Sequence, residues 1–479
     1  MKNILFFLCF AALPYFSFAQ WEPDVRLTFD PAKSQVYSSS SRCIAANGDA
    51  VHITWYDERD GHRQIYYKRS LDGGSTWGTD ARLTVTSAEA WLPAIAVNGD
   101  HVYIIWEDYR DGNYGEIYFK SSSDGGDTWC PDVRLTNDPA GSIMPSLSVS
   151  DSVIHVTWQE ERDNNGGEIY YKRSGDGGIT WEPDVCLTVD PGYSGSPSIA
   201  VTGSNVHIVW EDDRDGDFGA IYYKRSTDGG STWGSDTPLT TSANDFWDKS
   251  IAVVDSAVHV VFCDSYSILE VYYRRSTDNG ITWEEIKKLT TATGISRYAS
   301  IAAGDSLVHI VWEDSRDGNF EIYYKRSIDK GITWEPDVRL TNAIYNSLMP
   351  CVALADSVVH IGWYDKRDFN DEIYYKRDPT GNVVIATGSA GENISQTPFY
   401  IFPNPANELL NIRFRTSEHT DIGIRIINMS GQTVMKWDLV TINRLTEFLM
   451  DISDISEGLY FLEVKLGLKK YFTKVVIIR

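Results

Sequence analysis

The stretch Ser70-Leu71-Asp72-Gly73-Gly74-Ser75-Thr76-Trp77 decides the fold of this 479-residue chain, because it is one of six copies. The other copies occupy residues 122–129, 174–181, 226–233, 276–283 and 327–334. Successive tryptophans of these copies lie 52, 52, 52, 50 and 51 residues apart. Six copies of S-x-D-x-G-x-T-W at one period indicate a repeat architecture.

Each period contains four short β-rich segments. In the fourth unit these are Ser198–Val201, Val206–Asp212, Ile221–Arg225 and a last segment that ends at Pro238-Leu239-Thr240. Runs rich in Val, Ile and Tyr, separated by Gly- and Asp-rich turns, are typical of antiparallel strands. The sequence therefore predicts one four-stranded meander per period.

The two ends of the repeat array are complementary. Counting Val-His-Ile-x-Trp segments gives seven units, and the seventh ends near Gly381 without a box or a fourth strand. The segment Trp21–Thr28 has the pattern of a fourth strand with no unit before it, and nearly the same sequence recurs at 334–341. We predict that this orphan strand completes the last sheet, which favours a closed seven-bladed β-propeller over an open solenoid.

Composition supports an all-β chain and excludes one class of partner. The sequence contains 16 Trp, 27 Tyr, 18 Phe and 37 Gly, a content typical of turn-rich β proteins. The net charge is −24, and all of this negative charge falls between residues 20 and 399, since both ends of the chain are slightly positive. Because so acidic a body repels phosphate backbones, we expect no nucleic-acid partner.

The N-terminus has the pattern of an export signal. Lys2 is followed by an apolar run over residues 4–13 and by Ser17-Phe18-Ala19, which predicts a signal peptide over residues 1–19. The run is too short to span a bilayer, and no other stretch is long enough, so we expect a secreted chain with no transmembrane span. The rest divides into a propeller over 20–381, a linker over 382–399 and a C-terminal β-sandwich over 400–479.

The repeated units resemble the Asp boxes, or bacterial neuraminidase repeats, of the sialidase-like propellers. This resemblance covers about residues 21–381 and implies the fold more strongly than the function, because Asp boxes occur in sialidases, other glycosidases, lectins and noncatalytic surface proteins. The box Asp can accept backbone N–H bonds within its turn, and the Gly permits a positive φ. We therefore expect structural roles for the box residues Asp72, Asp124, Asp176, Asp228, Asp278 and Asp329.

The tail carries a second resemblance. Its Pro403-Asn404-Pro405-Ala406 opening, its Asn428-Met429-Ser430-Gly431 turn, its Ser456–Tyr460 stretch and its basic end with Lys474 and Arg479 resemble the type A C-terminal sorting domain of the type IX secretion system. That resemblance implies that the tail engages the secretion machinery and directs export across the outer membrane. It further implies that the tail is removed, with anchoring to surface lipopolysaccharide or release. An ordinary accessory β-sandwich is the alternative.

The sequence argues against catalysis. The sialidase resemblance implies three arginines that clamp a sugar carboxylate, a Tyr–Glu nucleophile pair and an Asp acid/base. In that family the first arginine lies in a Phe/Tyr-Arg-Ile-Pro motif near the N-terminus, and this chain has no such motif. Arg42, Arg63 and Arg297 lie outside the positions that recur from unit to unit, but they assemble no recognisable triad. We therefore expect no catalytic residue and keep a sialidase-like exo-glycoside hydrolase as the alternative.

Two further sets of residues recur at matching positions in the repeated units. The turn between the second and third strands repeats the pattern of Trp55, Asp57, Arg59 and Asp60 in six units. We favour Arg–carboxylate pairs that hold the blades together, with six sugar sites as the alternative. The strand histidines are expected to be satisfied by hydrogen bonds rather than by a metal: His52, His155, His207, His259, His309 and His360. A calcium loop beginning at Glu211 is disfavoured, because sister units lack its ligands. We expect no metal and no cofactor.

The candidate ligand site consists of aromatic and basic residues that the repeat does not explain. Of the 16 tryptophans, thirteen follow the repeat and Trp437 belongs to the tail, which leaves Trp91 and Trp247. Tyr193, Arg297 and Tyr298 occupy comparable loops before the first strands. Aromatic faces suit sugar rings and arginine suits a carboxylate, although these side chains could also plug the ring. We predict a monomeric surface propeller that binds a glycan or a surface protein, and a purely structural module is the third reading.

Overall fold

The computed structural model describes residues 21–477 except 38–41, 113, 162–165, 190–191, 217–218, 242–245, 265–268, 382–398, 403–408, 416–419, 429–431, 443–444 and 467–468. The predicted signal peptide and nearly all of the predicted linker lie outside the described residues. The chain divides into two compact units, Met1–Val384 and Ile385–Arg479. Every regular element in the described part is a strand, and none of it could cross a membrane as a helix. The domain bounds derived from the sequence stay a prediction.

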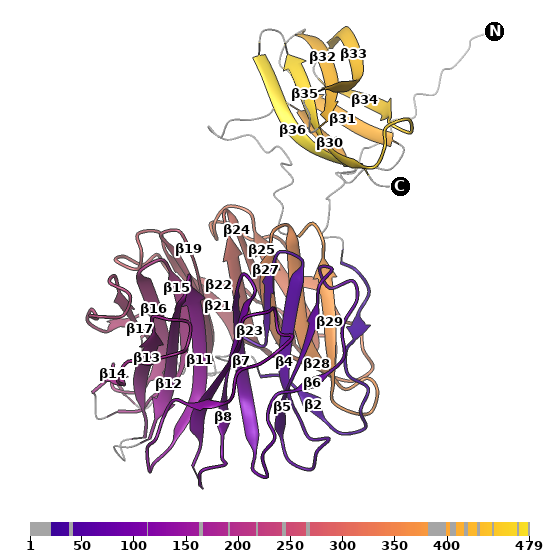
Figure 1. Cartoon of the computed structure of the whole chain (residues 1–479). Coiled ribbons are helices and arrows are strands. Elements are labelled where there is room, and N and C mark those ends of the chain that lie inside the picture. The colour runs from indigo at the N-terminus through magenta and orange to yellow at the C-terminus, as the bar shows by residue number, and fades with distance from the viewer. Residues whose placement is uncertain are drawn as a thin grey trace, which may run out of the picture. The chain divides into compact units, whose positions relative to one another are not determined.

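Seven antiparallel sheets, which we call blades 1 to 7, make up the first unit (Figure 1). Blade 1 contains β2 (Ser34–Gln35), β3 (Ile44–Asn47), β4 (Ala50–Asp57), β5 (Gln64–Ser70) and β6 (Ala81–Arg82). Blade 2 contains β7 (Ala90–Asn98), β8 (His101–Asp108), β9 (Glu116–Ser122) and β10 (Val133–Arg134). Blade 3 contains β11 (Ser142–Ser150), β12 (Val153–Glu160), β13 (Glu168–Ser174) and β14 (Val185–Cys186).

The remaining blades repeat this order. Blade 4 contains β15 (Ser194–Thr202), β16 (Asn205–Asp212), β17 (Ala220–Ser226) and β18 (Thr237–Pro238). Blade 5 contains β19 (Phe246–Val254), β20 (Ala257–Asp264), β21 (Glu270–Ser276) and β22 (Lys287–Lys288). Blade 6 contains β23 (Ser296–Gly304), β24 (Leu307–Asp314), β25 (Glu321–Ser327) and β26 (Val338–Arg339). Blade 7 contains β27 (Ser347–Ala355), β28 (Val358–Asp365), β29 (Glu372–Asp378) and, from the other end of the repeat array, β1 (Val25–Arg26).

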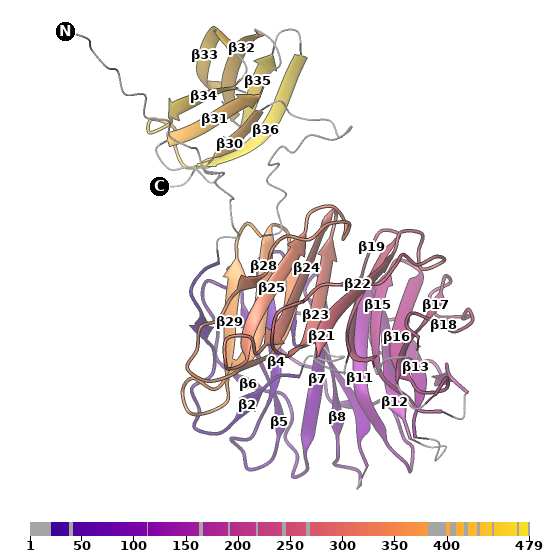
Figure 2. The ribbon, with the colours of Figure 1, turned by 180° about the vertical axis from the view of Figure 1, so that it is seen from behind.

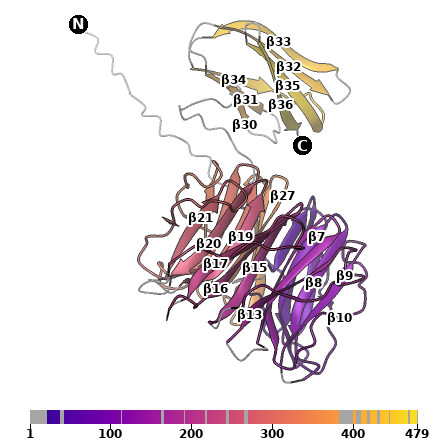
Figure 3. The same cartoon turned by 90° about the vertical axis from the view of Figure 1, so that its left-hand side faces the viewer.

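The blades form a closed ring. The first strand of each blade contacts the first strand of the next, and β27 contacts β3, so the contacts return to blade 1. Figures 2 and 3 show successive sheets standing beside one another in chain order. Second strands such as β8 and β12 are buried along almost their whole length, because each is covered by sheets on both faces. The predicted seven-bladed β-propeller is confirmed.

The N-terminal strand closes the ring, as the sequence predicts. Val25 pairs with Tyr375 and Arg26 with Tyr374 in antiparallel register. Trp21 meets the ring of Tyr324 in blade 6 edge to face, with centroids 4.9 Å apart. Carboxylates of the same segment bind blade 7, with Glu22 on Arg377 at 2.7 Å and Asp24 on Arg367 at 2.7 Å. The two ends of the propeller are therefore joined by strand pairing, an aromatic contact and ion pairs.

Blade 1 differs from the others at its first strand. β2 and β3 both pair with β4, whereas one continuous first strand pairs with the second strand in every other blade. Shortly before β3, the Arg42 guanidinium donates to the carbonyl of Ile251 in blade 5, at 2.7 Å. The backbone N–H of Cys43 contacts the Cys351 sulfur at 3.4 Å, and both buried cysteines are free thiols.

The second unit is a two-sheet β-sandwich. One sheet contains β30 (Phe399–Phe402), β31 (Leu409–Arg415) and β34 (Leu445–Asp451). The other contains β32 (Thr420–Asn428), β33 (Thr433–Ile442), β35 (Gly458–Leu466) and β36 (Lys469–Ile477). Its core combines buried residues of both sheets, including Ile412, Met450, Ile426 and Leu462.

We predict that deleting residues 20–28 abolishes cooperative unfolding of the propeller. The deletion leaves β29 as an open edge and removes Trp21, whose aromatic contact alone is worth about 0.5–1.5 kcal/mol. Trp21→Ala keeps the strand and should lower the melting temperature while the transition stays cooperative. Calorimetry of both variants tests this prediction, and a deletion variant that melts like the intact protein contradicts it.

Candidate functional site

The box aspartates are hydrogen-bonded within their own turns. Asp72 Oδ2 accepts the Thr76 hydroxyl at 2.6 Å, and Asp72 Oδ1 accepts the Thr76 backbone N–H at 2.8 Å. These two hydrogen bonds lower the pKa of Asp72 to about 2. The same pair of bonds is made by Asp124, Asp176, Asp228, Asp278 and Asp329.

Each box also binds the preceding blade. Trp129 of blade 2 meets the ring of Tyr67 in blade 1 edge to face, with centroids 5.0 Å apart. The carbonyl of Gly125 accepts a bond from Arg69 at 2.5 Å. Gly126, with φ +91°, lies so close to Tyr67 that an added Cβ would be 2.1 Å from its hydroxyl oxygen. Asp boxes thus join neighbouring blades as well as shaping their own turns.

The turns between second and third strands are held by hydrogen bonds among their own Trp, Asp and Arg side chains. Trp55 Nε1 donates to Asp57 Oδ2 at 2.8 Å, and Arg59 makes two further side-chain bonds to Asp57 and one to Asp80. Trp55 and Asp57 are 0% exposed, so no sugar ring can lie on this tryptophan. Matching guanidinium–carboxylate pairs occur at Arg110, Arg214, Arg316 and Arg367. The alternative of six sugar sites on these tryptophans is wrong.

Each strand histidine makes a hydrogen bond through Nδ1, while Nε2 of His52, His259 and His360 is buried without a hydrogen-bond partner in the described part of the propeller. His52 Nδ1 lies 2.6 Å from the hydroxyl of Tyr67, and the other strand histidines each pair with a tyrosine in the same way. Burial lowers the pKa of His52 to about 4, so this imidazole is neutral at physiological pH. Within the described residues no three His, Cys, Asp or Glu side chains are grouped as metal ligands.

The predicted ligand residues lie at the other end of the ring from the Asp boxes. First strands begin where second strands end, as the pairing of Ser142 with Glu160 shows, and we call this end the mouth. Trp91 lies in β7, Trp247 in β19, and Arg297 and Tyr298 in β23, while Tyr193 directly precedes β15. The sequence assigned these positions to loops. Four are in strands instead, because each first strand begins ahead of a β-bulge.

Three of the five residues form one cluster. The rings of Trp247 and Tyr298 meet edge to face at 5.6 Å, from neighbouring blades 5 and 6. The Arg297 guanidinium lies 4.9 Å from the centre of the Tyr298 ring, and its Nε donates to Glu313 Oε1 at 2.8 Å. All three of these residues are partly exposed, whereas Glu313 is buried.

Trp91 and Tyr193 belong to other sectors of the mouth. Trp91 lies under the guanidinium of Arg63, at 4.3 Å, between blades 1 and 2. The Tyr193 hydroxyl donates to Gln159 Oε1 at 3.1 Å, between blades 3 and 4. The described contacts therefore give one joined cluster and two separate aromatic positions.

Sequence reasoning missed a column of polar residues that follows the second-strand tryptophan. Each side chain accepts the N–H of the bulge residue in the next blade, and the pairs are Glu107 with Met144, Gln159 with Ser196, Glu211 with Asp248 and Glu313 with Met349. Burial raises the pKa of Glu107 to about 7, against the opposing effect of a hydrogen bond from Tyr109. The sequence offered one indication of this set: the position holds Glu in some blades and Gln, Cys or Tyr in others, so it does not follow the repeat.

Asp248 and Lys249 form the second feature that was missed. Four sister bulges have proline at the position of Lys249, namely Pro93, Pro145, Pro197 and Pro350. Lys249 is fully buried and binds Glu211 Oε1 at 2.6 Å. Asp248 is 2% exposed, and burial, followed by the charge of Glu211, raises its pKa well above the usual range.

A closed ring of four-stranded sheets joined by Asp boxes defines a sialidase-like β-propeller. Two family profiles match the chain: the BNR repeat-like domain over residues 56–310 and the secretion system C-terminal sorting domain over residues 400–478. Because the first match covers more than half of the sequence, the chain belongs to the BNR repeat-like family. The sorting domain indicates export across the outer membrane to the cell surface or the extracellular space.

Solved structures share the fold at low identity. An ulvan lyase, a polysaccharide lyase bound to -[GlcA(1-4)Rha3S]-, is 10% identical with a TM-score of 0.54, over 74% of this chain and 95% of that one. The BP39L lectin of Burkholderia pseudomallei is 12% identical with a TM-score of 0.52, over 68% of this chain and 94% of that one. At these identities the likeness shows the fold alone. No curated protein matches the chain.

We predict that Glu107→Gln stabilises the propeller at alkaline pH. The folded state raises the pKa of Glu107 from 4.5 to about 7, so ionisation of this carboxyl disfavours folding as the pH rises through 7. At pH 8 the variant should be more stable by up to about 3 kcal/mol, and the difference should shrink as the pH falls toward 4.5. Gln159→Glu at the matching position is the mirror control, and denaturant titrations at pH 5 and pH 8 measure both. A gain that is the same at both pH values contradicts the assignment.

Proposed function

We propose that this protein is a noncatalytic, secreted propeller that binds glycans at its mouth. The cluster of Trp247, Tyr298 and Arg297 carries the proposal, because it is partly exposed and lies outside the columns that hold the blades together. Aromatic faces pack on the apolar faces of sugar rings, and a guanidinium recognises a carboxylate or hydroxyl oxygens. A surface protein presenting similar groups is the alternative ligand.

Two comparisons support a carbohydrate ligand. The ulvan lyase structure holds a saccharide and the Burkholderia protein is a lectin, so this fold accommodates sugar recognition with and without catalysis. Neither relationship identifies the sugar for this chain. The exported location is consistent with a protein that meets polysaccharides outside the cell.

The arginines of the mouth favour binding over hydrolysis. Arg42 is bound to the Ile251 carbonyl, Arg63 to Glu58, and Arg297 to Glu313. Each is therefore held by its own partner, whereas the sialidase resemblance implies three arginines that converge on one carboxylate. The expectation of a noncatalytic protein remains a proposal.

One observation favours sialidase-like glycoside hydrolysis as a second candidate function. Asp248 has the raised pKa of a general acid and lies next to the Tyr298 sector. Its side chain is buried, however, so a substrate could reach it only after the mouth rearranges. Turnover of aryl sialosides that is lost in Asp248→Asn would establish hydrolysis and overturn the noncatalytic proposal.

We predict that Trp247→Ala and Arg297→Ala weaken binding of a glycan found on an array by about tenfold each, with little change in melting temperature. A lost charge-assisted hydrogen bond or aromatic contact accounts for an effect of that size. Trp91→Ala and Tyr193→Ala test the separate positions in the same assay. Unchanged affinity with a lowered melting temperature would instead identify these residues as packing that fills the ring.

We also propose that the tail is removed after export. The intact mass of protein recovered from the native host should lack about 80 residues at the C-terminus, because a sorting domain is dispensable once the chain has crossed the membrane. Mass spectrometry of the surface and medium fractions distinguishes an anchored product from a released one. Surface protein that still ends at Arg479 contradicts the proposal.

A further inference from the structure

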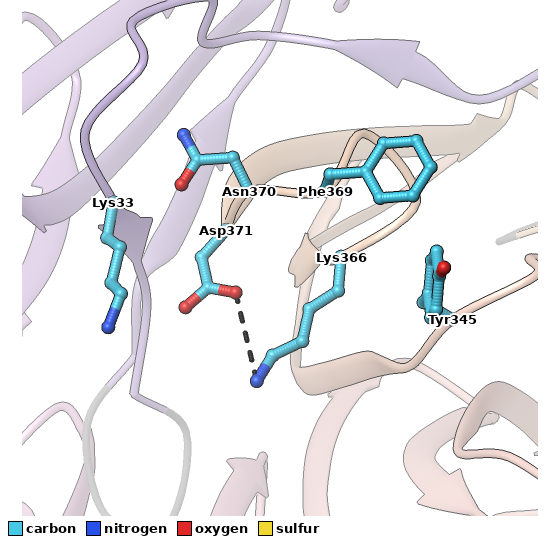
Figure 4. Close-up of a pocket in the computed structure, with 6 residues that line it drawn as sticks. All are labelled: Lys33, Tyr345, Lys366, Phe369, Asn370 and Asp371. Carbon is cyan, nitrogen blue, oxygen red and sulfur yellow. Dashed lines mark ion pairs between the residues drawn. The ribbon is translucent and has the colours of Figure 1, made fainter.

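A shallow pocket of about 330 Å³ lies between blade 7 and the segment leading into blade 1 (Figure 4). It is lined by Lys33, Tyr345, Lys366, Phe369, Asn370 and Asp371. Figure 4 shows the two lysine side chains on either side of Asp371, with Phe369 and Tyr345 on the far side of Lys366 from Lys33. This volume falls at the small end of ligand pockets.

The two lysines of the pocket are weakly engaged. The strand lysines of the propeller bind aspartates at 2.7–2.8 Å, as Lys68 binds Asp80. Lys366 is 3.8 Å from Asp371, which also accepts a bond from Gln35. Lys33 is exposed and makes no ion pair within the described part of the chain. Sister turns have Glu58, Tyr109, Asp213 or Ser315 at the position of Lys366, so this blade alone replaces an acidic or hydroxyl side chain with a cation.

The aromatic residues of the pocket are unusually exposed. Phe369 is 87% and Tyr345 43% exposed, and their rings meet edge to face at 5.4 Å. Phe369 has φ +62°, whereas sister turns have glycine at this position, as at Gly61 and Gly318. A bulky residue is strained in this region, and strained residues cluster at functional sites. Nothing in the packing of the turn explains a phenylalanine here.

We infer that this pocket binds an anionic sugar residue, a uronate or a sulfated sugar, within a polysaccharide. Lys33 and Lys366 supply positive charge for the anionic group, and Phe369 with Tyr345 offers an aromatic surface for the sugar ring. Asp371 supplies acceptor oxygens for sugar hydroxyls, whereas the side-chain amide of Asn370 already donates to the carbonyls of Asp30 and Ala32. Because the chain has a net charge of −24, its overall field repels an anionic ligand, and the two lysines supply the local positive charge that such a ligand needs.

Contacts within blades 6 and 7 link the pocket to the Trp247–Tyr298–Arg297 cluster. Lys366 Nζ lies 5.9 Å from the centre of the Tyr364 ring, and Tyr364 pairs with Leu348 of β27. The N–H of the next residue, Met349, donates to Glu313, the partner of Arg297. One saccharide chain could therefore contact both places. The inference rests on the proposed function to this extent, since it names the class of glycan that the mouth binds.

The full-length chain should be tested with three probes: polygalacturonate, dextran sulfate and neutral dextran. Lys33→Gln with Lys366→Gln should weaken binding of the anionic probe about tenfold or more, because two charge-assisted contacts are lost. Phe369→Gly should also weaken it, yet raise the melting temperature slightly, because glycine relieves the positive φ. Lys330→Gln, an exposed lysine in the blade 6 box at the opposite end, removes one charge as a control.

The outcomes separate the two proposals. Binding of polygalacturonate alone identifies a uronate, binding of dextran sulfate alone a sulfated sugar, and binding of both supports a general anionic site. Absence of binding to either anionic probe, or pocket variants that bind like Lys330→Gln, overturns the inference. If an array glycan is lost in Trp247→Ala but retained in the pocket variants, the inference fails while the proposed function stands. If anionic binding is lost only in the pocket variants, the pocket is confirmed and the role proposed for Trp247 fails.

Discussion

Docking of each Asp box onto the blade before it is the interaction on which the whole ring depends. A box tryptophan packs edge to face on an aromatic ring of the preceding blade at 4.8–5.1 Å in every blade that has a box. Trp21 takes this place for blade 7, at 4.9 Å from Tyr324. Seven equivalent contacts join the seven sheets, and the contact of Trp77 with Tyr375 joins the first sheet to the last. Without the N-terminal segment that carries Trp21, β29 would be an open strand edge.

The same repetition explains why most polar residues of the propeller are unavailable for function. Box aspartates bind their own turns, strand histidines bind tyrosines, and turn arginines bind buried aspartates. Chemistry for a ligand must therefore come from positions where one blade departs from its sisters. Asp248 and Lys249 in blade 5, Arg297 in blade 6, and Lys366 and Phe369 in blade 7 are such departures. Because they lie in the consecutive blades 5, 6 and 7, one side of the mouth differs in sequence from the rest.

The fold could be predicted almost completely from the sequence, whereas the site could be predicted only in part. Period, box and orphan strand are local patterns, and the pairing of the orphan strand with the last sheet follows from counting strands. Trp247 and Arg297 stood out because they break the repeat, but that signal does not give the pairing of Arg297 with Glu313. Glu107 could not be recognised because its raised pKa comes from burial against the next blade. The sequence shows that Phe369 replaces the glycine of sister turns, but its positive φ and its exposure are seen only in the structure.

The proposed pocket lies where the N-terminal segment closes the ring against blade 7. Lys33 follows the strand that completes blade 7, while Lys366 and Phe369 belong to the turn of blade 7 beside it. Asn370 of that turn donates to the carbonyls of Asp30 and Ala32, which fixes the N-terminal segment against blade 7. The geometry of the pocket therefore exists only in the closed ring. A ligand that bridges Lys33 and Lys366 binds the closed state alone, and by mass action it stabilises the one junction of the ring that the chain does not join covalently.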